Sequence, residues 1–253
     1  MESRPDYEHL DEDLFHPHVK EVTEALLEEF GRPTLGNKKN PFNELLYIIL
    51  SSRTPPENYQ ETYRSLRRKF KTANSIAEAR VEYVAKAIEP GGLQNKKARA
   101  ITETASRLKE TYGRVTLAPL KRMETEEAEK FLTSLPGVST KTARCVLMYA
   151  LDRPVFPVDV HCYRVAQRLG WVPSNEPLTK RRADELQEGV PEHLRRDLHV
   201  GMVLLSRHYC RPKAPGCGEC PVLECCPTGQ RALVPVSENT CSSIPCQLLV
   251  AKS

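Results

Sequence analysis

The chain has 253 residues, of which 40% are hydrophobic and 28% charged, and a formal net charge of +4. This composition is typical of a soluble globular protein with one large or two smaller cores. No run approaches the roughly 20 apolar residues that a membrane span requires, and the acidic N-terminus, with Glu2, Asp6 and Glu8, differs from signal and transit peptides. We therefore expect an intracellular protein without a membrane partner, cytoplasmic and nucleoid-associated if its source is bacterial. We also expect it to be a monomer. The small positive charge permits nucleic-acid binding without arguing for it.

Apolar residues recur with the period of an α-helix along most of the chain. The first stripe ends at Gly31, and Asn40-Pro41 has the residue types of an N-cap and a first helical position. No segment shows a convincing strand alternation, so the sequence predicts an all-α architecture. Helices are expected over 19–30, from Pro41, around 59–70, between Asn95 and Gly113, and over 125–132, 140–151, 160–169, 179–188 and 192–209.

Two segments interrupt this helical pattern. Residues 151–154, with the sequence Leu-Asp-Arg-Pro, form a plausible seam between two halves of the chain. After Cys226 prolines and glycines are frequent and apolar stripes are few, which favours an irregular tail over 229–253. Cys241 and Cys246 lie in this tail and have no assigned partner.

A short turn, Leu135-Pro136-Gly137-Val138-Ser139, separates two of the predicted helices. Pro136 ends the first helix, and Gly137 can adopt a positive φ or allow another backbone to come close. The second helix then presents free N–H groups and the positive end of its dipole, which suit a phosphate. On these residues alone, a plain helix–turn–helix corner is an equally good interpretation.

Lys141 follows this turn directly and favours the functional interpretation. A cation is unfavourable near a helix N-terminus, so the position predicts a lowered pKa and a larger fraction of nucleophilic amine. Asp159 occupies the N-cap position of a later helix that ends at Gly170. Capping alone would explain an isolated aspartate, but it also keeps the carboxylate ionised and able to stabilise an oxocarbenium-like sugar. If both groups share one cleft, they predict attack on a sugar carbon of DNA.

The chain has nine cysteines, and seven of them lie in residues 210–246. An odd, clustered set in a chain without a secretion signal indicates a metal site rather than a disulfide framework. Zinc sites with four cysteines usually contain two separate C-x2-C knuckles, whereas this loop has one close pair and encloses the whole site. The spacing C-x6-C-x2-C-x5-C therefore favours a 4Fe–4S cluster, with the ligands Cys210, Cys217, Cys220 and Cys226.

Neighbouring residues on this loop leave two questions open. Cys225 could replace Cys226 as a ligand, although the spacing favours Cys226. Arg211 and Lys213 lie between the first two ligands, where the loop would present them outward, either to grip a phosphate or simply to water.

Taken together, these segments resemble the endonuclease III family of helix-hairpin-helix (HhH-GPD) DNA glycosylases, which carry an iron–sulfur cluster loop. Residues 135–143, LPGVSTKTA, match the family hairpin with its catalytic lysine, and residues 158–161, VDVH, match the segment with its catalytic aspartate. The four cysteines match the iron–sulfur loop. Residues 92–98, GLQNKKA, are similar to a segment whose leucine, Leu93 here, wedges into DNA beside the lesion. The similarity extends from about residue 18 to residue 228.

The resemblance implies two helical lobes with a DNA-binding groove between them. The six-helix domain that contains the hairpin would cover residues 41–153, and the cluster domain would combine residues 1–40 with residues 154–228. Double-stranded DNA containing a damaged base or an abasic site would lie bent across the groove, with the damaged nucleotide flipped into a pocket.

The same resemblance implies a bifunctional glycosylase and AP lyase of base excision repair that removes oxidised pyrimidines. Lys141 would attack the sugar C1′ and displace the base, β-elimination from the Schiff base would cut the strand 3′ to the lesion, and Asp159 would assist deprotonation and charge stabilisation. Carbonyls near Leu135, Gly137 and Val138 would hold a monovalent cation against phosphate, and the cluster would be structural or a redox reporter. The DNA-contacting residues implied are Arg53, Leu93, Lys96, Leu135, Gly137, Val138, Ser139, Lys141, Arg211 and Lys213.

Three positions depart from the family pattern. Ser139 replaces the second hairpin glycine, Arg53 stands where a glutamine usually fills the gap left by the flipped base, and Pro56 stands at an acidic position. Arginine donates hydrogen bonds but does not accept them, so the preference for the opposite base could differ.

Two alternatives are weaker. The monofunctional adenine or mismatch branch of the superfamily lacks the nucleophilic lysine and uses a glutamate near the position of Ile48, whereas this chain has Lys141 and no carboxylate at that place. A non-catalytic DNA-binding module or a redox sensor on the same scaffold would not need both Lys141 and Asp159.

Overall fold

The computed structural model describes residues 14–234. Over this range the chain is helical, with no β-strand, which confirms the all-α prediction. None of these helices is both long enough and apolar enough to cross a membrane. The α-helices are α1 (Val19–Phe30), α2 (Pro41–Ser51), α3 (Pro56–Lys69), α4 (Asn74–Ala77), α5 (Val81–Ala87), α6 (Gln94–Tyr112), α7 (Thr125–Thr133), α8 (Thr140–Leu151), α9 (Val160–Leu169), α10 (Lys180–Glu188), α11 (Arg195–His208) and α12 (Pro227–Leu233).

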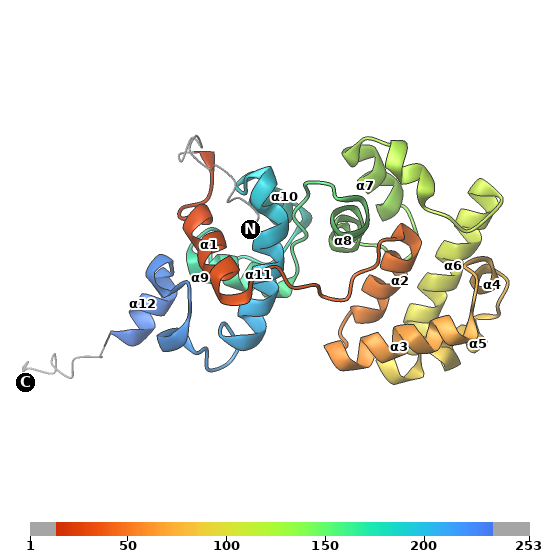
Figure 1. Ribbon diagram of the computed structural model, residues 1–253, viewed down its shortest axis with the longest axis horizontal. Helices are drawn as coiled ribbons and strands as arrows, with labels where there is room; N and C mark the ends of the chain where they lie inside the picture. Colours follow the sequence, from red (N-terminus) through yellow and green to blue (C-terminus); the bar gives the residue numbers. More distant parts are fainter. Residues whose placement is uncertain (1–13, 235–253) are drawn as a thin grey trace, which may run out of the picture.

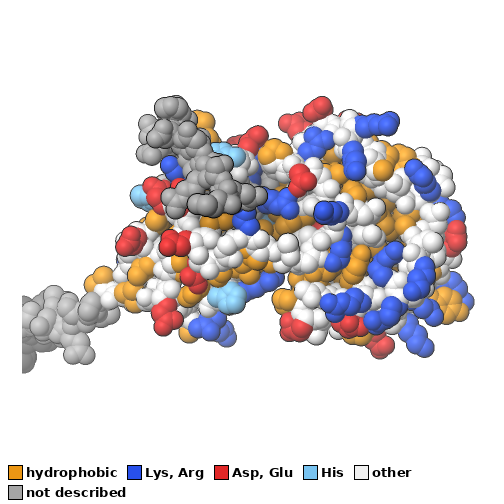
Figure 2. Space-filling model, viewed as in Figure 1, with side chains coloured by type: hydrophobic (Ala, Val, Ile, Leu, Met, Phe, Trp, Pro, Cys, Tyr) orange, Lys and Arg blue, Asp and Glu red, His pale blue; other side chains and the backbone are white. Residues whose placement is uncertain are grey.

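One lobe is built from α2 to α8 around a hydrophobic core of its own (Figure 1). Leu45 and Leu50 of α2 are fully buried in this core, and α2 packs against both α3 and α8. Asn40 caps α2 by accepting a hydrogen bond from the Asn43 N–H at 3.0 Å, as its sequence predicted. Lysine and arginine side chains are spread over the surface of this lobe (Figure 2).

The second lobe joins α1 to α9, α10, α11 and α12 around a separate core (Figure 1). α1 packs against α11, and α11 packs against α9. Gly201 of α11 makes the first contact possible, because a Cβ at this position would lie 2.8 Å from the Cβ of Leu26 in α1. The N-terminal helix therefore belongs to the lobe formed by the C-terminal helices, and the two-lobe prediction is confirmed.

Val155 packs in the core of the first lobe and Phe156 packs in the core of the second lobe. We propose that the domain boundary lies between these two residues.

A buried arginine connects the lobes. Arg144 of α8 is only 3% exposed, and its guanidinium donates to Glu129 of α7, with Nε and Oε2 3.0 Å apart, and to Asp184 of α10. Because α7 and α10 belong to different lobes, this network fixes the position of one lobe against the other.

The structure also adds elements that the sequence pattern did not predict. The short helices α4 and α5 were missed, and residues 192–209 divide into a 3₁₀ turn, Glu192–Leu194, and α11. Residues 229–233 are helical and not irregular, because Pro227 starts α12 and the Cys226 sulfur accepts from the Gly229 N–H. Cys241 and Cys246 lie outside the described residues.

Candidate active site

The hairpin before α8 determines where Lys141 lies. Gly137 has a φ of +72°, and a Cβ at this position would lie 2.6 Å from the Cβ of Ala100 in α6, so both the backbone conformation and the close approach to α6 require glycine. Ser139 caps α8, because its hydroxyl accepts from the Thr142 N–H at 3.3 Å. The serine that departs from the family's hairpin pattern therefore has a local structural role.

Lys141 and Asp159 line the same cavity, which has a volume of about 630 Å³. Lys141 lies in the first turn of α8, in one lobe, and Asp159 directly precedes α9, in the other. In the described part of the chain, Lys141 and Asp159 do not form an ion pair with a distance of 4.0 Å or less. The amine and the carboxylate therefore face one space large enough for a small ligand, with room between them.

The pKa of Lys141 is raised, and the prediction that it would be lowered is wrong. Burial is the largest single influence and acts to lower the pKa, but the acidic groups around the ammonium, Cys145, Asp159 and Cys162, outweigh it. We regard the Asp159 carboxylate as the effective neighbour at neutral pH, because burial raises the pKa of Cys145 to about 11 and leaves its thiol uncharged. The helix dipole acts only within α8, whereas this carboxylate comes from the start of α9. Lys141 is therefore an ammonium in the free protein.

Asp159 caps α9, as the sequence predicted. One carboxylate oxygen accepts from the His161 N–H at 2.9 Å and from the Cys162 N–H at 3.0 Å. Burial would raise its pKa, but the positive charge of Lys141 and the capping hydrogen bonds lower it. His199 lines the same cavity, and burial lowers its pKa to about 4, so its imidazole is neutral. No sequence pattern had marked this histidine. At neutral pH the site thus contains an ammonium, a carboxylate and an uncharged imidazole.

Arg53 and Leu93, the residues expected to probe the DNA, share an unusual backbone conformation. Each has a φ of +53°, in a region that residues other than glycine rarely adopt. Both are exposed, Leu93 to 48%, and Arg53 also lines the cavity with Lys141 and Asp159. Such strained positions recur at functional sites, where the surrounding structure must hold them in place.

Lys97 supplies that support by joining the two segments. It is 5% exposed, and its ammonium donates to the Leu50 carbonyl at 2.9 Å, the Thr54 hydroxyl at 2.7 Å and the Gly91 carbonyl at 3.0 Å. All three donors of the ammonium are thereby used. The neighbouring Lys96, which the sequence pattern indicates as a DNA contact, is exposed. No sequence pattern marks Lys97, because only the folded structure distinguishes the two lysines.

The other predicted DNA-contacting residues are divided between buried and exposed positions. The side chains of Leu135 and Val138 are 2% and 7% exposed, so only their backbone atoms are available to a ligand. Arg211 and Lys213 are exposed on the cysteine loop, as expected, and they are not among the residues that line the cavity of Lys141 and Asp159.

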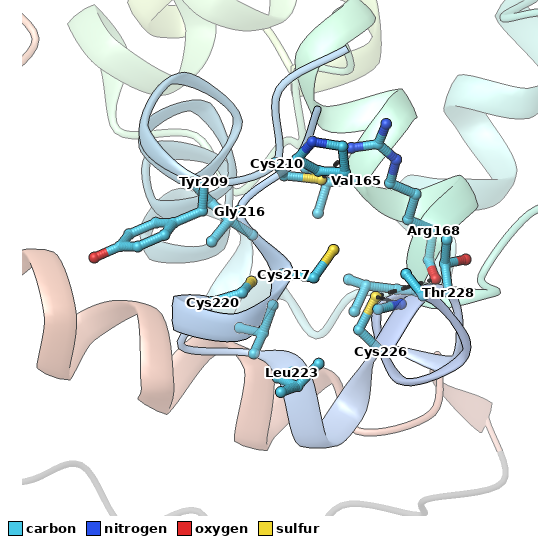
Figure 3. A pocket seen from close by; sticks show the side chains of 16 residues that line it. Val165, Arg168, Tyr209, Cys210, Gly216, Cys217, Cys220, Leu223, Cys226 and Thr228 are labelled. Carbon is cyan, nitrogen blue, oxygen red and sulfur yellow. Dashed lines mark hydrogen bonds between the residues drawn. The ribbon is translucent and has the colours of Figure 1, made fainter. Parts of the chain in front are cut away.

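Four cysteines surround a second cavity, of about 110 Å³, in the other lobe (Figure 3). Cys210, Cys217, Cys220 and Cys226 line it, whereas Cys225 does not, and all five are free thiols. N–H groups already point at two of the sulfurs. The Arg168 Nη1 donates to Cys210 at 3.1 Å, and the Gly229 N–H donates to Cys226 at 3.3 Å.

These cysteines fit a polynuclear centre better than a single ion. Within residues 14–234 no three cysteine, histidine or carboxylate side chains are grouped closely enough to hold one metal ion, yet the four cysteines face one common space. Burial and, to a smaller extent, repulsion from the neighbouring cysteines raise the pKa of Cys220 to about 11. A cationic cluster would offset that repulsion, and N–H donors to the sulfurs are typical of such sites.

Comparisons with known proteins agree with this geometry. Residues 46–192, more than half of the chain, match the family model described as HhH-GPD superfamily base excision DNA repair protein. Endonuclease III of Thermotoga maritima is 30% identical over 202 residues, which are 80% of this chain and 89% of that protein. The putative DNA glycosylase At3g47830 of Arabidopsis thaliana is 36% identical over 155 residues, which are 61% of this chain and 53% of that protein.

A solved structure shows the same fold. "Structure of a non-covalent Endonuclease III-DNA Complex" superposes with a TM-score of 0.74 at 24% identity and covers 88% of this chain and 99% of that one. Fold and sequence together define a base excision DNA glycosylase of the helix-hairpin-helix class. Within that class, the chain belongs to the endonuclease III family.

Proposed function

We propose that this enzyme is a bifunctional DNA glycosylase and AP lyase that acts as a monomer on double-stranded DNA and removes oxidised or ring-saturated pyrimidines. One observation carries the proposal: Lys141 and Asp159 face the same cavity, so a deoxyribose placed there would meet a primary amine and an anion together. The relatives named endonuclease III support the same reaction class.

The chemistry follows from these two groups. Lys141 first gives up a proton within the cavity, for which Asp159 is the nearest charged acceptor. Its amine then attacks the sugar C1′, the bond from C1′ to the base breaks, and the base leaves with the electron pair and takes up a proton. The anionic Asp159 stabilises the positive charge that develops on the sugar. Opening of the sugar ring gives a Schiff base, and loss of a C2′ proton then expels the 3′ phosphate, which cuts the strand.

DNA recognition in this proposal uses the two strained residues. Leu93 would enter the base stack beside the lesion, and Arg53, at the edge of the cavity, would occupy the gap left by the flipped nucleotide. The hairpin would bind phosphate through its backbone, with the cap at Ser139 and a monovalent cation on the carbonyls near Gly137. The exposed Lys96, Arg211 and Lys213 would contact phosphates.

A 4Fe–4S cluster is the second part of the proposal. Cys210, Cys217, Cys220 and Cys226 would hold it, and Cys226 is preferred to Cys225 because Cys226 lines the cavity and Cys225 does not. The cluster would join the loop after α11 to the start of α12, and it would supply structural cross-linking and redox capacity rather than bond cleavage.

Borohydride trapping tests the reaction. We expect the protein to form a covalent adduct with a duplex that contains a single dihydrouracil, and Lys141→Ala to abolish it. Lys109→Ala is the matched control, because this half-buried lysine of α6 pairs with Glu78 outside the cavity and should leave the adduct unchanged. Base release that leaves only intact abasic strands would mean a monofunctional glycosylase, and no base release from any lesion would mean a binding module.

A further inference from the structure

Two residues that line the active-site cavity each have a buried polar atom without a partner. Among the described residues, only three buried side-chain polar atoms lack a hydrogen bond: Asn37 Oδ1, Arg67 Nη1 and Tyr149 Oη. Asn37 and Tyr149 both line the cavity that contains Lys141 and Asp159. Buried polar groups in native proteins are almost always paired, so two exceptions at one functional cavity indicate groups that a ligand completes.

The orientation of the Asn37 amide is set by a buried carboxylate. Glu44 of α2 is 0% exposed, and it accepts from the Asn37 Nδ2 at 2.6 Å and from the Lys38 N–H at 2.5 Å. Turning the amide over would place its oxygen against that carboxylate, which repels it. Asn37 is therefore held with its donor toward Glu44 and its acceptor, Oδ1, left over for another group.

Tyr149 presents the complementary group. It lies on α8 about two turns after Lys141, and its ring packs edge-on against His199, with centroids 5.9 Å apart. Burial raises the pKa of its hydroxyl well above the ordinary value, so the group stays protonated and can donate. Its neighbours thus fix the ring, while its hydroxyl has no partner.

We propose that Asn37 and Tyr149 read the edge of the extruded base. Asn37 Oδ1 accepts from a base N–H, and the Tyr149 hydroxyl donates to a carbonyl oxygen beside it. A uracil- or thymine-type pyrimidine with its N3–H next to a carbonyl has this pattern, and ring saturation leaves the pattern intact. Both protein atoms are closed off from water in this structure, so the proposal includes a small movement of the cavity wall that brings them to the edge of the base. The inference rests on the proposed glycosylase function but not on the lyase step.

Tyr149→Phe provides the first test, because it removes only the hydroxyl. Release of dihydrouracil, measured by alkaline cleavage so that the readout is independent of lyase activity, should slow by roughly 10- to 100-fold in kcat/KM. Adduct formation with a preformed abasic site, which has no base to read, should change less than about twofold. The melting temperature should stay equal or rise, since an unpaired buried hydroxyl is lost.

Controls separate this inference from the proposed function. Tyr112→Phe removes a hydroxyl outside the cavity and should leave all three readouts unchanged. Unchanged base release in Tyr149→Phe would overturn the inference. An equal loss of adduct formation with abasic DNA would also overturn it, because it would mean that Tyr149 acts by positioning Lys141. Failure of the wild-type protein to release any base would refute the proposed function itself.

An altered base tests the acceptor. We expect the wild-type enzyme to release N3-methyl-dihydrouracil at least about tenfold more slowly than dihydrouracil, because the methyl group removes the donor. In Asn37→Ala this discrimination should largely disappear. If that variant does not fold, because Glu44 has lost its partner, the double variant Asn37→Ala/Glu44→Leu removes the carboxylate as well. Discrimination that persists in the folded variant would overturn the assignment of Asn37.

Discussion

Asp159→Asn separates the charge of Asp159 from its capping role. The carboxylate oxygen that accepts from the His161 and Cys162 N–H groups can be replaced by the amide oxygen of asparagine, which is as good an N-cap. Only the negative charge is then lost. Asp159→Ala loses both the charge and the cap, and the additional loss of the cap costs about 1 kcal/mol of stability.

The electrostatic effect can be bounded from the geometry. Lys141 and Asp159 are not among the ion pairs within 4.0 Å, so their attraction is below the ~4 kcal/mol expected for two unit charges at that distance in an effective dielectric of about 20. Removal of the charge should therefore lower the pKa of Lys141 by less than about 3 units.

The directions in which the pKa values of Lys141 and Asp159 are shifted also define a pH window for stability. The pKa of Lys141 is raised above 10.5 and that of Asp159 is lowered below 3.8. The contribution of the Lys141 charge to the free energy of unfolding is complete below pH 10.5, and it is lost as the pH rises through the pKa of Lys141 in the folded state. The aspartate contribution is complete above pH 3.8 and is lost as the pH falls through the folded-state pKa. Asp159→Asn should therefore destabilise the protein between these limits, and the difference from wild type should shrink beyond them.

Two kinetic readouts should respond differently to Asp159→Asn. Base release should fall by about 10²- to 10⁴-fold, the usual contribution of a positioned acid–base group. Adduct formation with a preformed abasic site should fall much less, because a lower pKa of Lys141 increases the fraction of free amine at each pH. The pH profile of trapping should move to lower pH by the same number of units as the pKa of Lys141. An unshifted profile, or equal losses in the asparagine and alanine variants for both substrates, would refute the electrostatic role and leave only the cap.

Three further predictions concern the framework of the site. Lys97→Met should lower the free energy of unfolding in urea by ~3 kcal/mol, since two buried carbonyls lose their partner. It should also slow excision from a paired duplex more than trapping of an abasic site. Equal effects on both reactions would mean that Lys97 stabilises the fold without positioning Arg53 and Leu93. Arg144→Met should cost ~3 kcal/mol in the same assay, near the low end for a broken buried ion pair, because Asp184 keeps Lys180; a loss below about 1 kcal/mol would show that the lobes do not depend on this network. Cys226→Ser should abolish the visible absorbance of the iron–sulfur cluster, whereas Cys225→Ser should retain it, and the reverse result would exchange the two ligands.

Local chemistry explains why much of the fold could be predicted. α8 and α9 begin where the sequence placed them, because Ser139 and Asp159 are capping residues whose partners lie two or three positions away. Gly137 could be selected for the same reason, since its φ of +72° is a property of the turn. Short helices such as α4 and α5 carry too few residues for a periodic pattern to be visible.

Features that depend on distant segments could not be predicted. Lys96 and Lys97 are adjacent and chemically identical, and only the packing of α6 against the Leu50 and Gly91 segments makes one of them a buried anchor. Asn37 lies in a loop without any motif, and it becomes important only because Glu44 is buried beside it. The pKa of Lys141 was predicted in the wrong direction for the same reason, because the groups that raise it include Asp159, which belongs to the other lobe.

The raised pKa of Lys141 has a mechanistic consequence. In the free protein the nucleophile is an ammonium and its neighbour Asp159 is a weak base, so proton transfer between them is unfavourable, and a DNA phosphate nearby would raise the pKa of Lys141 further. Entry of a base into the cavity removes water from both groups, and desolvation lowers the pKa of an ammonium and raises that of a carboxylate. We therefore expect the fraction of free amine to rise when a nucleotide, or a bare deoxyribose at an abasic site, fills the cavity. Occupation of the cavity and activation of the nucleophile would then be linked, and a nucleotide that stays in the duplex would meet a lysine that is still an ammonium.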